Sequence, residues 1–272
     1  MKNQIISKIT KIISITLVVV LFAFYAYSYY NNSVILKQTE ENLAIKSLIQ
    51  SLKEGDMNAQ ADALKAMAEM GESAVQPLIS ALEDESVKFR RKAADALINI
   101  GDPAVEPLIE ALDDNHQKIR RSAAFALEKG DPNWASSDAA INYIPSLIAS
   151  LNSTDTTLRD DTVNMLSKIG EPAVQPLLAI LTDNNWHVRE SAVSALGKIK
   201  APQSVKALVN MLDDDHWQVR RTAAYVLGKM DSSLAIIPLR EALKDKSTDV
   251  KTAANKSLKR LALIVSEPVE EE

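Results

Sequence analysis

The strongest constraint on the fold is a short sequence pattern that occurs six times. Each copy has a Leu, a second Leu four positions later, a polar turn, and a basic residue twelve positions after the first Leu. The copies begin at Leu78, Leu108, Leu147, Leu177, Leu208 and Leu239, so the steps are 30, 39, 30, 31 and 31 residues. Such a period is typical of stacked helical repeats, in which no unit buries its apolar face alone. A surface for partners is therefore the first functional expectation.

Each repeat divides into two amphipathic helices. The first apolar stripe has the spacing i, i+3, i+4 and i+7, as in Val75, Leu78, Ile79 and Leu82. The second stripe has spacings of four, four and three, as in Phe89, Ala93, Leu97 and Ile100. A fainter copy of the first stripe makes residues 44–71 a degenerate first repeat. We therefore predict an all-α fold, an α-solenoid of about seven helix pairs.

The residues between the helices agree with this division. Good N-cap residues stand four positions before the basic residue in four repeats, namely Ser86, Asp155, Asn185 and Ser247. Gly101 and Gly170, each followed two positions later by Pro, end one repeat and open the next. Small residues in the second helices allow close approach of neighbours: Ala93, Ala123, Ala192, Ala223 and Ala254.

Three sequence features carry a family resemblance. They are Ala-Val-Gln-Pro-Leu-Ile-Ser-Ala-Leu-Glu-Asp at 74–84, Val-Arg at 188–189 and 219–220, and Leu-Gly-Lys at 196–198 and 227–229. With them the chain resembles short HEAT-type repeats, also called phycobilisome-lyase-like HEAT repeats, over about residues 44–262. The resemblance implies stacked helix pairs. It leaves function open, because such repeats serve scaffolds, chromophore-lyase subunits, a metal-dependent hydroxylase and some nucleic-acid enzymes.

A second segment bears on the location of the chain. From Ile12 to Leu36 the sequence has no charged residue over 25 positions, and three Lys precede this segment. An apolar helix of roughly 20 residues spans a bilayer, and tyrosines favour its interface. We therefore expect a single transmembrane helix that uses residues 12–30, with a cytoplasmic N-terminus and an extracytoplasmic solenoid. The segment also fits a cleaved signal peptide with the small-x-small triplet Ala26-Tyr27-Ser28, which leaves a secreted solenoid as the alternative.

These features divide the chain into an anchor or signal segment (1–36), the solenoid (37–262) and an acidic tail for which we expect disorder (263–272). After residue 36 the chain has 28 Lys and Arg against 36 Asp and Glu, a formal net charge of −8. Such a surface does not favour nonspecific binding of nucleic acid. The chain has no Cys, which excludes disulfides and thiol chemistry. The sequence does not fix the oligomeric state.

The recurrent basic residue has two interpretations. Five repeats carry Arg there: Arg90, Arg120, Arg159, Arg189 and Arg220. A ladder of guanidinium groups can clamp carboxylates or phosphates of a ligand. Alternatively, an Asp six residues earlier meets the Arg across the turn, since Asp84, Asp114, Asp183, Asp214 and Asp245 recur there. The resemblance to HEAT-type repeats implies such an internal Asp–Arg lattice, which we expect here.

Residues that break the repeat are better candidates for a site. Trp186 and Trp217 occupy equivalent positions at the start of consecutive second helices, next to His187 and His216. With Arg221 they can form a binding hot spot for a protein partner, because Trp and Arg dominate such sites. Packing of the rings on neighbouring turns is the alternative.

The longest step between repeats contains a further candidate. Nine extra residues lie around positions 131–138 and include Trp134. Insertions in solenoids map to loops on one face and often bind partners. Trp134 can instead fill the wedge where the insertion disturbs stacking, and we favour this packing role.

The sequence shows no catalytic constellation. The HEAT-type hydroxylase uses repeated His-Glu pairs for its metal, whereas the three His of this chain precede Gln117, Val188 and Trp217. We therefore predict a membrane-tethered scaffold or adaptor that binds another, membrane-associated protein, with no cofactor and no catalysis of its own. The alternative is a phycobilin-lyase-like or chaperone-like subunit that binds a chromophore or small ligand in the groove of the solenoid.

Overall fold

The computed structural model describes the backbone of residues 2–266 and the side chains of residues 24, 25 and 27–262. Every regular element within these residues is a helix, which confirms the all-α prediction. The chain divides into two compact units, residues 1–67 and 68–272. The predicted tail at 263–272 lies outside the residues with described side chains.

The first unit contains the long helix α1 (Lys2–Glu54) and most of α2 (Met57–Met70). Helix α1 runs without a break through residue 36, where we placed the end of the N-terminal segment. That boundary stays a prediction. Several aromatic side chains of α1 are exposed by about two thirds or more: Phe24, Tyr25, Tyr27, Tyr29 and Tyr30.

The predicted membrane localisation is contradicted. Among the residues that the structure describes, no helix has a stretch that is both long and apolar enough to cross a membrane. The single-pass topology with an extracytoplasmic solenoid is therefore corrected. Residues 12–23, the apolar centre of the predicted anchor, lie outside the residues with described side chains.

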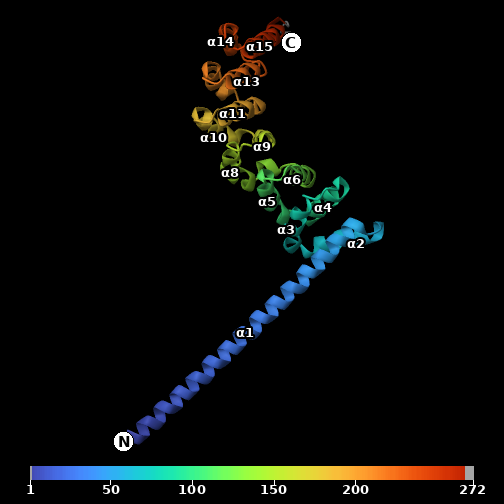
Figure 1. The fold of residues 1–272 in the computed structure, drawn as a ribbon, viewed down its shortest axis with the longest axis vertical. Helices are drawn as coiled ribbons and strands as arrows, with labels where there is room; N and C mark the ends of the chain where they lie inside the picture. Colours follow the sequence, from blue (N-terminus) through green and yellow to red (C-terminus); the bar gives the residue numbers. More distant parts are fainter. Residues whose placement is uncertain (1, 267–272) are drawn as a thin grey trace, which may run out of the picture. The chain divides into compact units, whose positions relative to one another are not determined.

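In the second unit, helix pairs follow one another in chain order, and each pair packs against the next (Figure 1). The first helices of the pairs are α3 (Glu72–Ala81), α5 (Asp102–Glu110), α8 (Ile144–Ser150), α10 (Val174–Ala179), α12 (Val205–Asn210) and α14 (Ile236–Ala242). The second helices are α4 (Val87–Ile100), α6 (Gln117–Gly130), α9 (Thr156–Ile169), α11 (Trp186–Ile199), α13 (Trp217–Leu227) and α15 (Thr248–Ser266). The insertion forms η2 (Trp134–Ser136) and α7 (Asp138–Asn142).

Short 3-10 turns extend several first helices or precede them. They are η1 (Ala111–Asp113), η3 (Glu171–Ala173), η4 (Ile180–Thr182), η5 (Pro202–Ser204), η6 (Met211–Asp213) and η7 (Ser233–Ala235). At the ends of α4 and α9, Gly101 and Gly170 both have φ of 77°, with ψ of −136° and −128°. The positive φ favours glycine, but these ψ values differ from those of a left-handed helix end.

The predicted N-caps are also confirmed. The cap side chain accepts a backbone amide of the following helix at four positions: Ser86, Asp155, Asn185 and Ser247. In five repeats, the Asp two residues before the cap position accepts the amide of the residue at that position at 2.7–2.8 Å. The turn within each of these repeats is thus held by its own Asp.

The core lies between the helices of each pair and between neighbouring pairs. The predicted small residues of the second helices are fully buried: Ala93, Ala123, Ala192, Ala223 and Ala254. Glycines allow the closest contacts. A Cβ at Gly197 would lie 2.3 Å from Val226, and one at Gly228 would lie 2.7 Å from the Cα of Ser257. Helices α11, α13 and α15 are therefore packed more tightly than a side chain at either glycine permits.

Candidate partner-binding surface

Trp186 and Trp217 are the first residues of α11 and α13, but their environments differ. Trp186 is half-buried, and its ring stacks on His187 at 3.7 Å and on His216 of the next repeat at 4.2 Å. The second contact is almost parallel, with 5° between the ring planes. The structure thus brings together Trp186, His187 and His216 as a stack of rings, which agrees with the packing alternative for Trp186.

The environment of His187 favours the neutral ring. Burial lowers the pKa of His187, and the positive charge of Arg159 lowers it further, while Glu190 acts in the opposite direction. The Nδ1 atom of His187 is buried and has no hydrogen-bond partner among the described residues. A proton on this ring would place a second positive charge beside Arg159, so the stack is built for an uncharged imidazole.

Trp217 belongs to an exposed row of side chains along α13. Trp217, Arg221, Tyr225 and Lys229 follow at intervals of four residues, so they lie on one face of the helix and the turn after it. Trp217 is 37% exposed and Tyr225 is 51% exposed. The Arg221 guanidinium carbon lies 5.4 Å from the Trp217 ring centre, and Lys229 Nζ lies 4.5 Å from that of Tyr225. These four residues, the α13 stripe, form two exposed cation–π pairs.

A hollow of ≈ 380 Å³ lies beside the α13 stripe, between α13 and α15. Its walls come from three residues of α13 and four of α15: Arg221, Thr222, Tyr225, Asp249, Thr252, Ala253 and Lys256. Arg221 reaches Glu190 at 3.5 Å, yet its side chain is still 44% exposed. The hollow therefore combines an aromatic wall with cations open to solvent, and it can receive a side chain that carries negative charge.

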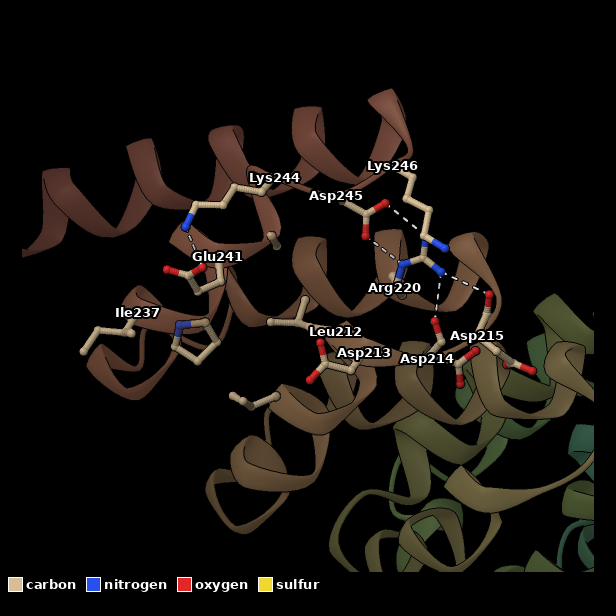
Figure 2. Close-up of a pocket in the computed structure, with 13 residues that line it drawn as sticks. Leu212, Asp213, Asp214, Asp215, Arg220, Ile237, Glu241, Lys244, Asp245 and Lys246 are labelled. Atoms are coloured by element: carbon tan, nitrogen blue, oxygen red, sulfur yellow. Dashed lines mark hydrogen bonds and ion pairs between the residues drawn. The ribbon is translucent and has the colours of Figure 1, made fainter.

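A larger hollow of ≈ 790 Å³ is lined by residues of α12, η6, α13 and α14 and of the turns that follow η6 and α14 (Figure 2). Its charged groups pair with one another: Arg220 with Asp245 at 2.7 Å, and Lys244 with Glu241 at 2.8 Å. The Arg220–Asp245 pair joins two repeats, whereas Lys244 and Glu241 pair within one repeat.

The recurrent Arg serves an internal lattice, but its carboxylate partner differs from the predicted one. Arg189 Nη1 donates to the backbone carbonyl of Asp183, six residues earlier, at 2.8 Å. Its Nε and Nη2 donate to the carboxylate of Asp214 in the next repeat at 2.7 and 2.8 Å. Burial opposes ionisation of Asp214, but the hydrogen bonds from Arg189 and the His216 amide outweigh it and lower the pKa of Asp214. The lattice therefore joins successive repeats.

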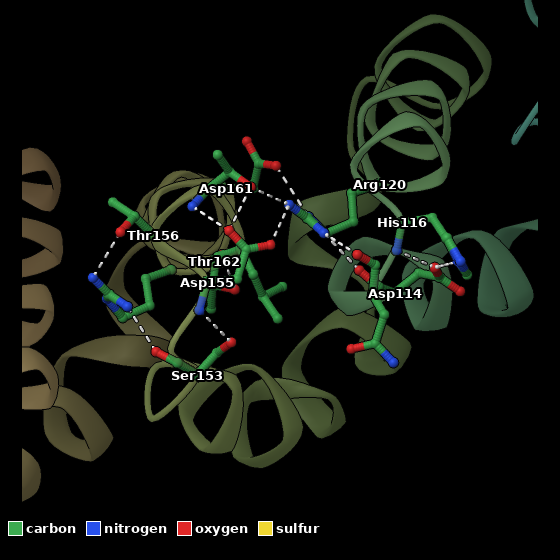
Figure 3. Close-up of polar contacts among 12 residues, drawn as sticks. Asp114, His116, Arg120, Ser153, Asp155, Thr156, Asp161 and Thr162 are labelled. Atoms are coloured by element: carbon green, nitrogen blue, oxygen red, sulfur yellow. Dashed lines mark hydrogen bonds and ion pairs between the residues drawn. The ribbon is translucent and has the colours of Figure 1, made fainter. Parts of the chain in front are cut away.

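The same arrangement recurs at two further steps. Arg220 binds the carbonyl of Asp214 at 2.8 Å and the carboxylate of Asp245 at 2.7 Å. Where the insertion lengthens the repeat, Arg120 binds the carbonyl of Asp114 at 2.8 Å and turns to Asp161 of α9 at 3.0 Å (Figure 3). The expectation that each Asp pairs with the Arg of its own repeat is therefore wrong at these steps. Each Arg takes a backbone carbonyl there and a carboxylate from the following repeat.

Arg159 departs from this arrangement. It is 8% exposed and donates to the carbonyl of Ser153 at 2.7 Å and to Thr156 Oγ1 at 3.2 Å. None of the ion pairs among the described residues involves its guanidinium. The step from the repeat of α9 to that of α11 thus has no Arg–Asp pair.

Trp134 does not reach the surface. It is only 2% exposed and starts η2 within the insertion, which agrees with the packing role. Among the described residues, no three His, Asp or Glu side chains come together as a metal site.

Sequence reasoning identified Trp217 and Arg221 but missed Tyr225, Lys229 and Lys256. The signal was present, because Tyr225 occupies a position that three other second helices fill with Asp95, Asn164 or Ser194, whereas α6 has Phe125 there. Alignment of the second helices by their basic residue would have revealed an aromatic residue at an exposed position.

Comparison with known proteins agrees with the fold described above. The sequence matches HEAT repeats over residues 45–128, 105–182 and 174–259. The chain belongs to the HEAT repeat family. The match concerns HEAT repeats in general and does not single out the lyase-type subgroup. No curated protein sequence matches the chain closely enough to count as a relative.

Solved structures with a similar fold include a chain of the Kap95p complex with RanGDP, at 18% identity and a TM-score of 0.53. That match covers 83% of this chain and 36% of the other, so this HEAT-repeat chain spans about a third of its length. Human deoxyhypusine hydroxylase is 18% identical with a TM-score of 0.38 and coverage of 84% and 99%. A designed armadillo repeat protein in complex with the peptide (KR)4 is 18% identical with a TM-score of 0.37 and coverage of 79% and 98%. At these identities the likeness concerns the fold alone.

Proposed function

We propose that this HEAT-repeat chain is a scaffold that binds another protein through the α13 stripe and the hollow between α13 and α15. The observation that carries the proposal is the pair of exposed aromatic rings, each covered by a cation, beside an open hollow. Trp, Tyr and Arg are the residues that contribute most to protein interfaces, because they bury large areas at a small entropic cost. The recurrent Arg–Asp lattice is used for contacts between repeats.

A catalytic role has no comparable support. Packing between repeats explains the shifted pKa values of the Arg–Asp lattice and of His187. Burial explains the pKa of Tyr143, which is raised to about 12. The chain therefore acts through binding, with the neighbouring repeats as a rigid support for the surface.

Photo-cross-linking tests the proposal. A photoreactive residue at position 225 is compared with one at position 95, the equivalent exposed position of α4, in cells that produce the full chain. We expect one protein to be captured from 225 and not from 95, and the double variant W217A/Y225A to reduce its co-purification while circular dichroism is unchanged. Equal capture from both positions, or unchanged co-purification with the variant, would show that the partner does not use this surface.

A further inference from the structure

The last two second helices form a positive region on an acidic protein. Residues 217–230 and 248–262 contain seven Lys and Arg against one acidic residue, Asp249. The equivalent residues of α9 and α11, at 156–169 and 186–199, contain four against three. The whole chain has a formal net charge of −5. Helices α4 and α6, at 87–100 and 117–130, contain eight against two, which is the same excess. Helices α13 and α15 differ because their positive charge lies beside the exposed rings of Trp217 and Tyr225.

From this juxtaposition we propose that the partner segment bound in the hollow between α13 and α15 is an acidic peptide, rich in Asp and Glu, that also places an apolar side chain on Tyr225 or Trp217. The inference rests on the proposed function and adds the chemistry of the partner. Carboxylates of the peptide lie against Arg221 and Lys256, which both line the hollow. Arg221 offers a planar fork that matches a carboxylate in two hydrogen bonds.

The cations of this surface are available for a ligand. Arg220, in the Arg–Asp lattice, is already held by Asp245. Among the described side chains, Arg221 has one ion pair, with Glu190 at 3.5 Å, and lies over the Trp217 ring. Lys256 takes part in none of the ion pairs among the described side chains. Lys229 lies over the Tyr225 ring, and its ammonium group has further N–H donors that can bind a carboxylate on the solvent side. A carboxylate on these groups replaces water, and the acidic groups near it are Asp249, which lines the hollow, and Glu190 beside Arg221.

The surroundings limit the size of the ligand. The positive region ends at acidic turns, since Asp213 and Asp215 are exposed before α13 and Asp245 precedes α15. A long polyanion such as nucleic acid, or an anionic bilayer, would meet these carboxylates as well as the cations. A short acidic segment of a protein fits between them.

The test uses the full chain and a fluorescein-labelled Glu-rich peptide with one Phe, followed by fluorescence anisotropy. A matched peptide with Gln in place of every Glu is the ligand control. We expect binding of the Glu peptide that weakens as salt rises, and about tenfold or greater weakening in R221E/K256E. The protein control R91E/K129E makes the same change of net charge on exposed second-helix positions of other repeats, and it should keep most of the affinity. The milder variant R221Q/K256Q is measured in the same way, and circular dichroism of each variant separates loss of binding from loss of fold.

Three outcomes would overturn the inference: equal binding of the Gln peptide, equal loss in R91E/K129E, or tighter binding to phosphatidylserine vesicles or duplex DNA than to the peptide. Self-association seen in light scattering at the peptide-binding concentration, and abolished by R221E/K256E, would instead assign the surface to a second copy. If the protein captured from position 225 still binds R221E/K256E, the proposed function stands and the acidic-peptide inference fails. Absence of capture from 225 would refute the proposed function itself.

Discussion

Gly197 offers the sharpest test of how the second helices pack. A methyl group at this position would lie 2.3 and 2.5 Å from the two Cγ atoms of Val226 on α13, and 2.9 Å from its Cβ. Contacts between carbon atoms are most favourable at about 3.5–4.0 Å, so Gly197→Ala must move α11 from α13 by roughly 1 Å or distort Val226. Val226 has few rotamers because it is β-branched, and it is 5% exposed.

The size of the effect follows from two opposing terms. Overpacking of a core contact costs about 1–3 kcal/mol, and Ala in place of Gly within a helix returns about 0.5–1 kcal/mol. We therefore expect Gly197→Ala to lower the free energy of unfolding by roughly 1–2 kcal/mol. Val226→Ala alone removes two buried methyl groups and should cost roughly 2 kcal/mol.

The double variant tests whether the side chains at positions 197 and 226 are in direct contact. In G197A/V226A the new methyl group occupies space that the Val226 methyls leave, so its loss of stability should be smaller than the sum of the two single losses by about 1 kcal/mol or more. Urea unfolding followed by circular dichroism measures all three variants against the parent. Strict additivity, or a Gly197→Ala variant as stable as the parent, would refute the close contact between α11 and α13.

Three further predictions follow from the same structure. Asp214→Asn removes one carboxylate from Arg189, in a pair whose side chains are 10% and 5% exposed, while Asp215 stays with Arg189 at 2.5 Å. Urea unfolding should show a loss of about 1.5–3 kcal/mol, whereas the exposed neighbour change Asp213→Asn should have little effect. The pKa of His187 is lowered in the folded chain, so its protonation favours unfolding, and the melting temperature should fall as the pH drops below the ordinary pKa of His. His187→Gln should make this fall smaller. The lowered pKa values of Asp214 and Asp245 produce a separate loss of stability only below the ordinary pKa range of carboxyl groups. Gly101→Ala meets no atom within 4 Å but forces Ala to a φ of 77° and a ψ of −136°, at a cost of about 1–3 kcal/mol. Gly130→Ala, which makes an ordinary contact with Ile98, should be neutral or slightly stabilising in thermal unfolding.

Local features of this HEAT-repeat chain follow directly from its sequence. Apolar periodicity, N-cap residues and the Gly–x–Pro junctions predict the helix pairs, because each depends on residues within one turn of each other. The partner of the repeated Arg could not be found in this way. The Asp recurs with the same period as the Arg, so a period alone does not distinguish a contact within one repeat from a contact between two.

The two Trp residues show the same limit. Trp186 and Trp217 occupy equivalent positions, yet the next repeat offers His216 to the first and Ser247 to the second. An imidazole stacks on the Trp186 ring and covers it, whereas a serine has no ring to place on Trp217. Exposure of Trp217 is thus decided by a residue 30 positions away, in the neighbouring layer.

The missing ion pair at Arg159 has a mechanical consequence. After this step, two consecutive Arg–Asp pairs join the repeats of α11, α13 and α15, so these three repeats should resist stretching as one block. Between α9 and α11 the described side chains form only contacts without an ion pair, such as Asn185 with Asn152 at 2.7 Å. Under tension the contact between the repeats of α9 and α11 should separate before the contacts within the block of α11, α13 and α15. The block that carries the α13 stripe should then keep its structure.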